Sequence, residues 1–106
     1  MSRAEARVLR RVRTTVHADA DIRSIAQWIA RDSAHAAAKW IDDLEREFSK
    51  IAQTPGIGTD RNDLRPQLRS VAFGNYLIFF KSMHNGVIVV RVIHGARDYA
   101  AIFRRR

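Results

Sequence analysis

The chain has 106 residues, enough for one domain with a modest hydrophobic core and too few for a second independently folded unit. Its composition, 46% hydrophobic and 28% charged, excludes a disordered chain, and the lack of cysteine excludes disulfides and thiolate metal sites. The net charge of +8 is unevenly distributed, because residues 17–60 hold eight acidic and five basic side chains whereas residues 61–106 hold two acidic and nine basic ones.

These properties predict a single domain over residues 1–106, with its core in residues 7–103 and short tails at residues 1–6 and 104–106. The sequence has no apolar run of the length that a signal peptide or a membrane span needs. We therefore expect a cytoplasmic protein that makes no contact with a membrane.

The first predicted strand runs from Arg7 to Arg13, where apolar residues and arginines are interleaved. We expect it at the edge of a sheet, because its arginines would hinder pairing with another copy of the chain. Thr15 is then a suitable N-cap for a helix that begins near Val16 to Ala18. Its apolar residues recur at i, i+3, i+4 and i+7, and they are Ile22, Ile25, Ala26 and Ile29.

A second helix is predicted between the cap residue Ser33 and the stop signal Thr54-Pro55-Gly56. Its apolar stripe consists of Ala37, Trp40, Ile41, Leu44, Phe48 and Ile51. Because only Asp32-Ser33 separates the two helices, we expect them to form an antiparallel hairpin.

Three strands are predicted after a loop over residues 56–66 that is rich in glycine, proline, Asn and Asp. They cover Leu68 to Phe73, Tyr76 to Lys81 and Val87 to Ile93, and the turns Gly74-Asn75 and Asn85-Gly86 connect them. The order β-α-α-β-β-β predicts an α+β fold, in which one antiparallel sheet carries the helical hairpin on a single face.

The uneven charge can now be assigned to predicted elements. The acidic middle segment of the sequence is the helical hairpin, and the basic flanking segments belong to the sheet. A cationic sheet face suits phosphate or an acidic peptide, and arginine in particular suits bidentate recognition of either anion. The alternative is solvated arginine that only keeps a small protein soluble.

Little in the sequence indicates cofactor or metal chemistry. The four histidines, at positions 17, 35, 84 and 94, lack the spacing of paired metal ligands, and Gly56-Ile-Gly58 is not followed by the helix signal or the lysine of a phosphate-binding loop. The carboxylates between Asp42 and Glu47 lie opposite the apolar stripe, where solvated charge is expected. We expect no metal and no cofactor.

The last predicted strand delivers His94, Arg97 and Asp98 within five residues of one another. Gly95 lets the backbone turn off the sheet, so that Arg97 can lean over the basic face beside Arg65 and Arg69. The residues alone leave a second interpretation open, namely a plain strand terminus with a surface pair between Arg97 and Asp98.

Several short motifs occur in order along the chain. They are Ala18-x-x-Asp21-Ile22-x-x-Ile25, the alanine-rich entry of the second helix and its Pro55-Gly56 exit, Arg69 before Val71, Tyr76-Leu-Ile-Phe-Phe80, and Val90-x-Val92-x-His94-x-x-Arg97-Asp98. This set resembles the ParE branch of the RelE/ParE toxin superfamily over about residues 8–103. The resemblance implies the same β-α-α-β-β-β order and a cognate ParD-like antitoxin whose C-terminal segment wraps the toxin.

Two activities are implied by the superfamily. RelE-like members cut messenger RNA on the ribosome, whereas ParE-like members poison DNA gyrase without a catalytic residue of their own. Six residues after Arg97, where RelE carries tyrosine, this chain has Phe103, which cannot transfer a proton. The resemblance therefore favours gyrase inhibition by protein–protein contact. Under the nuclease alternative, the site residues would be Arg65, Arg69, His94, Arg97 and Tyr99.

Two contact surfaces follow from the resemblance. We expect the target to bind the segment after the last strand, through His94, Arg97, Asp98, Tyr99 and Phe103. We expect the antitoxin to lie as an amphipathic segment over the helical hairpin, with or without a strand added to the sheet edge, through Ile25, Trp28, Ile29, Trp40 and Arg97. Trp28 lies off the main apolar stripe, so it either packs at the helix margin or forms an exposed anchor. A third possibility is a nontoxic basic module that binds nucleic acid nonspecifically.

Overall fold

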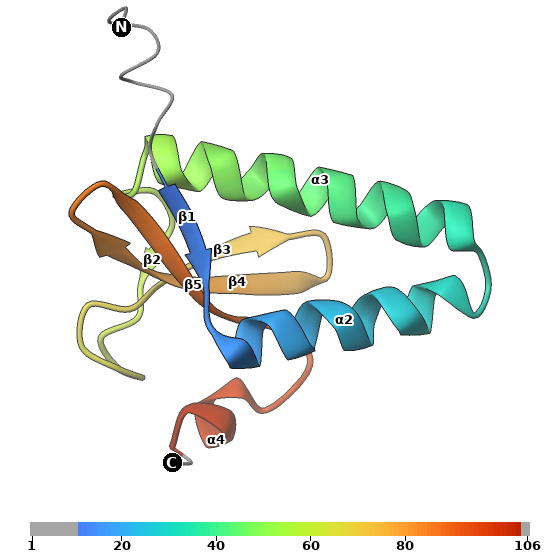
Figure 1. Ribbon diagram of the computed structural model, residues 1–106. Coiled ribbons are helices and arrows are strands. Elements are labelled where there is room, and N and C mark those ends of the chain that lie inside the picture. Colours follow the sequence, from blue (N-terminus) through green and yellow to red (C-terminus); the bar gives the residue numbers. More distant parts are fainter. Residues whose placement is uncertain (1–10, 105–106) are drawn as a thin grey trace, which may run out of the picture.

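The computed structural model describes residues 11–104, so the expected N-terminal tail, residues 7–10 of the first predicted strand, and Arg105 and Arg106 lie outside the described part. The elements are β1 (Arg11–Thr14), α2 (Val16–Ala30), α3 (Ala34–Gln53), β2 (Thr59–Asp60), β3 (Arg69–Phe73), β4 (Tyr76–Met83), β5 (Gly86–His94) and α4 (Tyr99–Arg104) (Figure 1). The predicted α+β class and the β-α-α-β-β-β order are confirmed. The short strand β2 and the helix α4 were not predicted, and Arg104, expected in a tail, ends α4.

Both predicted N-caps are confirmed. The Thr15 hydroxyl accepts a hydrogen bond from the amide of Ala18, and the Ser33 hydroxyl accepts one from the amide of Ala36. Each cap satisfies an amide that has no partner inside its own helix. The helical hairpin therefore begins and turns at the residues that the sequence indicated.

The sheet has the strand order β1-β5-β4-β3-β2, which places β1 at one edge as predicted. Strands β3, β4 and β5 form the expected antiparallel meander, but β1 pairs with β5 in parallel, from Arg11 opposite Gly86 to Thr14 opposite Val89. The expectation of an entirely antiparallel sheet is therefore wrong at this edge. Parallel neighbours need a long crossover, and here the chain from α2 through β4 supplies it.

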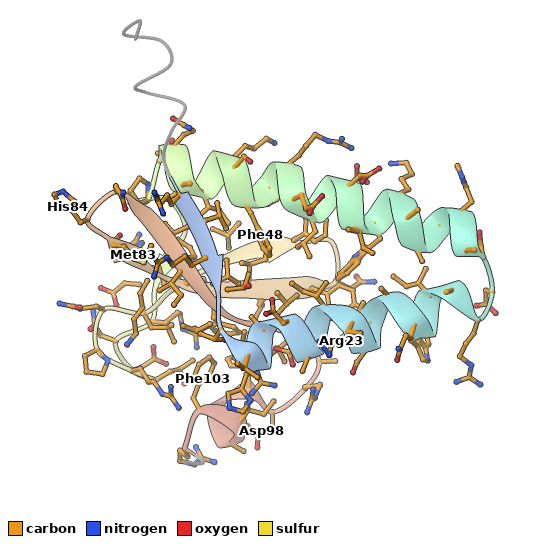
Figure 2. The ribbon with its side chains drawn as sticks, in the orientation of Figure 1. Arg23, Phe48, Met83, His84, Asp98 and Phe103 are labelled. Carbon is orange, nitrogen blue, oxygen red and sulfur yellow. The ribbon has the colours of Figure 1, made fainter. Side chains whose placement is uncertain are left out.

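The sheet separates two apolar clusters. On one face, α2 and α3 cover Ile78, Phe80, Val87 and Val89, and Leu44 and Phe48 of α3 pack against them. On the other face, Leu68, Phe79, Ile93 and Phe103 form a second cluster under α4. Figure 2 shows Phe48 between α3 and the sheet and Phe103 on the side of α4.

The second cluster shows that the prediction of helices on a single face of the sheet is wrong, because α4 packs on the face opposite the α2–α3 hairpin. Phe79 and Phe80 are neighbours in β4 and point to opposite faces, yet both are 0% exposed. A strand that is apolar on both faces needs a cover on both. The α2–α3 hairpin covers one face, and α4 with the loop before β3 covers the other. Among the helices of residues 11–104, none is long and apolar enough to cross a membrane.

Candidate partner-binding site

The free edge of β5 lies where the predicted C-terminal segment begins. The pairing with β1 ends at Val89, and the start of α2 satisfies the polar groups that follow. The Thr15 amide donates to the Val89 carbonyl over 3.0 Å, and the Thr15 hydroxyl donates to the Val90 carbonyl over 2.9 Å. The Asp21 carboxylate accepts from the Val92 amide over 2.9 Å. Because these groups already have partners, a partner chain cannot pair with them as an added strand.

An ion pair fastens α2 to this edge. The Arg91 guanidinium donates from Nε to Oδ2 of Asp21 over 2.7 Å and from Nη2 to Oδ1 over 2.8 Å. The Arg91 side chain is 21% exposed and the Asp21 side chain is 11% exposed. The hydrogen bonds to Asp21 raise the pKa of Arg91 above its ordinary value, while burial acts against this shift. Sequence reasoning did not single out this pair, because its two residues are far apart along the chain.

A groove of about 420 Å³ runs between α2 and the end of β5, and we call it the tryptophan groove. It is lined by Asp21, Ser24, Ile25, Trp28, Tyr76, Val92, His94 and Arg97. Trp28 is 63% exposed, so it is not a core residue at the helix margin. The groove thus joins Ile25, Trp28 and Arg97, expected at the antitoxin contact, to His94, expected at the target contact.

The other two residues expected at the antitoxin contact are not among those that line this groove. Trp40 packs inside the fold, with its ring centroid 6.1 Å from Phe73 and 5.6 Å from Tyr76. Ile29 lies half-buried in the last turn of α2. The tryptophan groove therefore draws its apolar surface from α2, from β5 and from Tyr76 of β4, and α3 contributes to it only through the contact between Trp40 and Tyr76.

Within the segment after β5, each polar residue has a distinct environment. The His94 ring stands edge-on to Tyr76 at 5.3 Å, and its Nδ1 accepts from the Ala96 amide over 3.0 Å. Asp98 accepts from the Ala101 amide over 3.1 Å and so caps α4. Among residues 11–104, no ion pair joins Asp98 to Arg97, which excludes the expected alternative of a surface pair in this structure. Arg97 itself is exposed.

A second cavity, of about 450 Å³, lies on the other side of Arg97, and we call it the arginine pocket. It is lined by Thr15, His17, Arg65, Val90, Arg91, Arg97, Ile102 and Phe103. Arg65 and Arg97 therefore line the same pocket, as the sequence predicted. Arg69 does not join them, because β4 separates its strand from β5 and its guanidinium donates to the carbonyls of Gly56, Ile57 and Gly58 over 2.8, 3.0 and 2.8 Å.

Two expected contact residues belong to the second core. Phe103 is 6% exposed, and its ring centroid lies 4.8 Å from that of Phe79. The Arg65 guanidinium lies 5.2 Å above the Phe103 ring. Tyr99 is half-buried, with its ring 5.6 Å from Phe79 and 5.0 Å from the Arg61 guanidinium. The expectation of Phe103 as a surface contact is therefore wrong in this structure, because its ring is needed to cover the sheet.

Besides Arg91, a second arginine of this region has a shifted pKa, and few of the residues expected for RNA cleavage come together in the arginine pocket. Arg61, which covers Tyr99, has a raised pKa, mainly because of its hydrogen bonds to Asp63, with burial acting against the shift. Of the five residues considered for RNA cleavage, only Arg65 and Arg97 line the arginine pocket. Within the described chain, no three His, Asp or Glu side chains gather in a way that could hold a metal ion.

Comparisons with known proteins agree on the family. The family described as the ParE toxin of the type II toxin–antitoxin system parDE matches residues 12–99. Toxin ParE3 of Caulobacter vibrioides is 28% identical over 65 residues, which cover 61% of this chain and 65% of that protein. A structure of the chromosomal ParDE toxin–antitoxin system from P. aeruginosa superposes on this chain with a TM-score of 0.65 at 17% sequence identity. The superposition covers 78% of this chain and 92% of the chain in that structure, and it supports the fold. The chain belongs to the ParE toxin family.

Proposed function

We propose that this protein is the toxin of a type II toxin–antitoxin pair, that it inhibits DNA gyrase in the cytoplasm by protein–protein contact, and that a ParD-like antitoxin holds it inactive. The observation that carries the proposal is the tryptophan groove, where an exposed Trp28 and an exposed Arg97 line one continuous surface. Tryptophan and arginine are the side chains that most often dominate protein–protein binding. The groove is thus suited to grip a protein rather than to catalyse a reaction.

The mode of binding follows from the β5 edge. Thr15 occupies the Val90 carbonyl and Asp21 occupies the Val92 amide, so these two backbone groups are closed to a partner strand and we expect side-chain contacts beside them. Ile25 and Trp28, three residues apart on α2, suit an amphipathic helix that lays its apolar face along α2. Arg97 at the end of the groove suits an acidic side chain of that helix.

A direct test combines purified gyrase, relaxed plasmid DNA and the toxin. We expect loss of supercoiling and accumulation of cleaved DNA that stays bound to gyrase. Arg97→Ala should weaken the inhibition, whereas Arg31→Ala is the matched control, because it removes the same charge at the exposed end of α2. Undiminished supercoiling at a large excess of folded toxin would refute gyrase as the target.

The RNA endonuclease is the alternative to be separated from this proposal. Cleavage would need a proton-transfer group beside Arg65 and Arg97, and His17 is the one imidazole that lines the arginine pocket. Ribosome-bound message should stay intact in the presence of the toxin. Fragments that disappear on His17→Ala or Arg97→Ala would overturn the gyrase proposal and favour the nuclease.

Neutralisation by the antitoxin has its own test. Co-expression with the antitoxin should restore growth and yield a stable complex. Trp28→Ala should release the toxin from that complex without unfolding it, because the Trp28 side chain is mostly in solvent. Serine at the neighbouring position 24 gives the control Ser24→Ala, which removes only a small polar group from the same groove.

A further inference from the structure

Apart from Arg97, which also lines the tryptophan groove, the residues of the arginine pocket have no role in the proposed contact with a protein partner. Three separate segments bring guanidinium groups to it: Arg65 comes from the loop before β3, Arg91 from β5 and Arg97 from the turn before α4. His17, from the first turn of α2, adds an imidazole. None of the eight residues that line the pocket is acidic. A concave site that only cations and neutral groups line attracts an anion.

The charges in the pocket differ in how far they are already neutralised. Arg91 is paired with Asp21, so its charge is largely compensated. Arg65 donates to the carbonyl oxygen of Phe103 over 3.2 Å, which leaves its positive charge uncompensated, and its position above the Phe103 ring orients the guanidinium. Arg97 is exposed and lines the pocket without such a contact among residues 11–104. Arg65 and Arg97 are therefore the two charges that a ligand can neutralise.

The surface of this pocket differs from that of the tryptophan groove in a way that selects the ligand. Protein partners bind most strongly through apolar anchors buried in a pocket. Here the Phe103 ring is 6% exposed and is covered by Arg65, and the apolar lining residues Val90 and Ile102 are half-buried, so no large apolar side chain stands exposed beside the guanidinium groups. The part of the chain that supplies Arg65, Arg91 and Arg97 is basic as a whole, because the described residues 61–104 carry seven basic and two acidic side chains. An extended polyanion exploits such an excess better than a single carboxylate does.

We propose that the arginine pocket binds the phosphodiester backbone of nucleic acid, with Arg65 and Arg97 as its phosphate contacts. The planar guanidinium groups suit bidentate contact with phosphate oxygens. We expect the binding to be independent of base sequence, because backbone contacts carry no sequence information and because stacking on the exposed His17 imidazole would not depend on which base is stacked. This site goes beyond the proposed function, since it requires neither gyrase nor an antitoxin.

Fluorescence anisotropy with the full chain and no other protein tests the site. The probes are a labelled 20-base-pair DNA duplex, a single-stranded RNA of equal length, and labelled poly-glutamate of matched charge, each titrated over a range of salt concentrations. Affinity for duplex DNA should fall as salt rises, with a slope of about −0.9 for each phosphate contact on a logarithmic plot. The DNA and RNA arms show which nucleic acid the backbone contact prefers.

The decisive comparison is between two single-charge variants. Arg97→Ala should reduce the magnitude of the slope by about one, whereas Arg97→Lys should keep it, because a lysine retains the phosphate's charge partner. Arg31→Ala removes the same charge at the exposed C-cap of α2, at the opposite end of the helix from His17, and should leave the slope unchanged. Circular dichroism melts confirm that each variant is folded, and Arg65→Lys examines the second contact without removing the charge that covers Phe103.

Three results would overturn the proposal. The first is the absence of salt-dependent binding to either nucleic acid. The second is an equal loss of slope in Arg97→Ala and Arg31→Ala, which would mean that only net charge matters. The third is poly-glutamate binding as tight as that of DNA and RNA with the same dependence on Arg97, which would assign the pocket to an acidic polypeptide. Because gyrase is absent from the assay, none of these results bears on gyrase inhibition.

Discussion

Asp21→Ala removes the side chain that fastens α2 to the free edge of β5. The Asp21 carboxylate accepts two hydrogen bonds from Arg91 and one from the Val92 amide, and it is 11% exposed. Removal of one partner from a buried ion pair costs about 3–5 kcal/mol, and the partial exposure of Arg91 lowers our expectation to about 2–3 kcal/mol. For a domain of this size that loss lowers the melting temperature by roughly 10–20 °C.

Urea denaturation followed by circular dichroism measures the loss in the free energy of unfolding of Asp21→Ala. Two further variants serve as comparisons. Asp19→Ala is the matched control, because Asp19 lies exposed in the first turn of the same helix and should contribute less than about 1 kcal/mol. Arg91→Ala combined with Asp21→Ala completes a double-mutant cycle, for which we expect a coupling free energy of about 1–2 kcal/mol. Equal losses in Asp21→Ala and Asp19→Ala would refute the reasoning.

Three further predictions concern single residues. Phe103→Ala should lower the free energy of unfolding by about 2–4 kcal/mol, because it uncovers Phe79; a change below about 1 kcal/mol in urea denaturation would show that α4 does not cover the sheet. Gly86→Ala should cost about 1–3 kcal/mol in the same measurement, since its new Cβ would overlap the backbone of Arg11 and disturb the β1–β5 pairing, and an unchanged stability would contradict that close approach. Trp28→Ala should keep the melting temperature within about 2 °C of the parent while weakening the antitoxin complex in a pull-down, and a large loss of stability would return Trp28 to the core.

The candidate site shows which of its features could be predicted from residue spacing along the chain. The segment from His94 to Asp98 was found from the sequence, since a strand end, a glycine and an arginine lie close together there. The separate roles of the residues in and after this segment could not be predicted from the sequence. Arg97 lines both cavities, whereas Asp98 caps α4 and Phe103 fills the second core. The residue types fitted an exposed contact surface and a helix equally well, because a six-residue helix has too few turns to show a period.

The sequence by itself determined the elements that depend on local chemistry. The caps Thr15 and Ser33, the two apolar helix stripes and the Gly74-Asn75 turn act within a few residues of one another, so their pattern is visible in one dimension. The predicted Asn85-Gly86 turn is wrong by one residue, because Gly86 pairs with Met83 as the first residue of β5 and the turn consists of His84 and Asn85. Only the tertiary structure decided the parallel pairing of β1 with β5, the cover on the second face of the sheet, and the contact between Asp21 and Arg91. These features join residues that lie far apart in the chain, and the hydrophobic burial and ion pairing that create them depend on three-dimensional proximity, which no local pattern encodes.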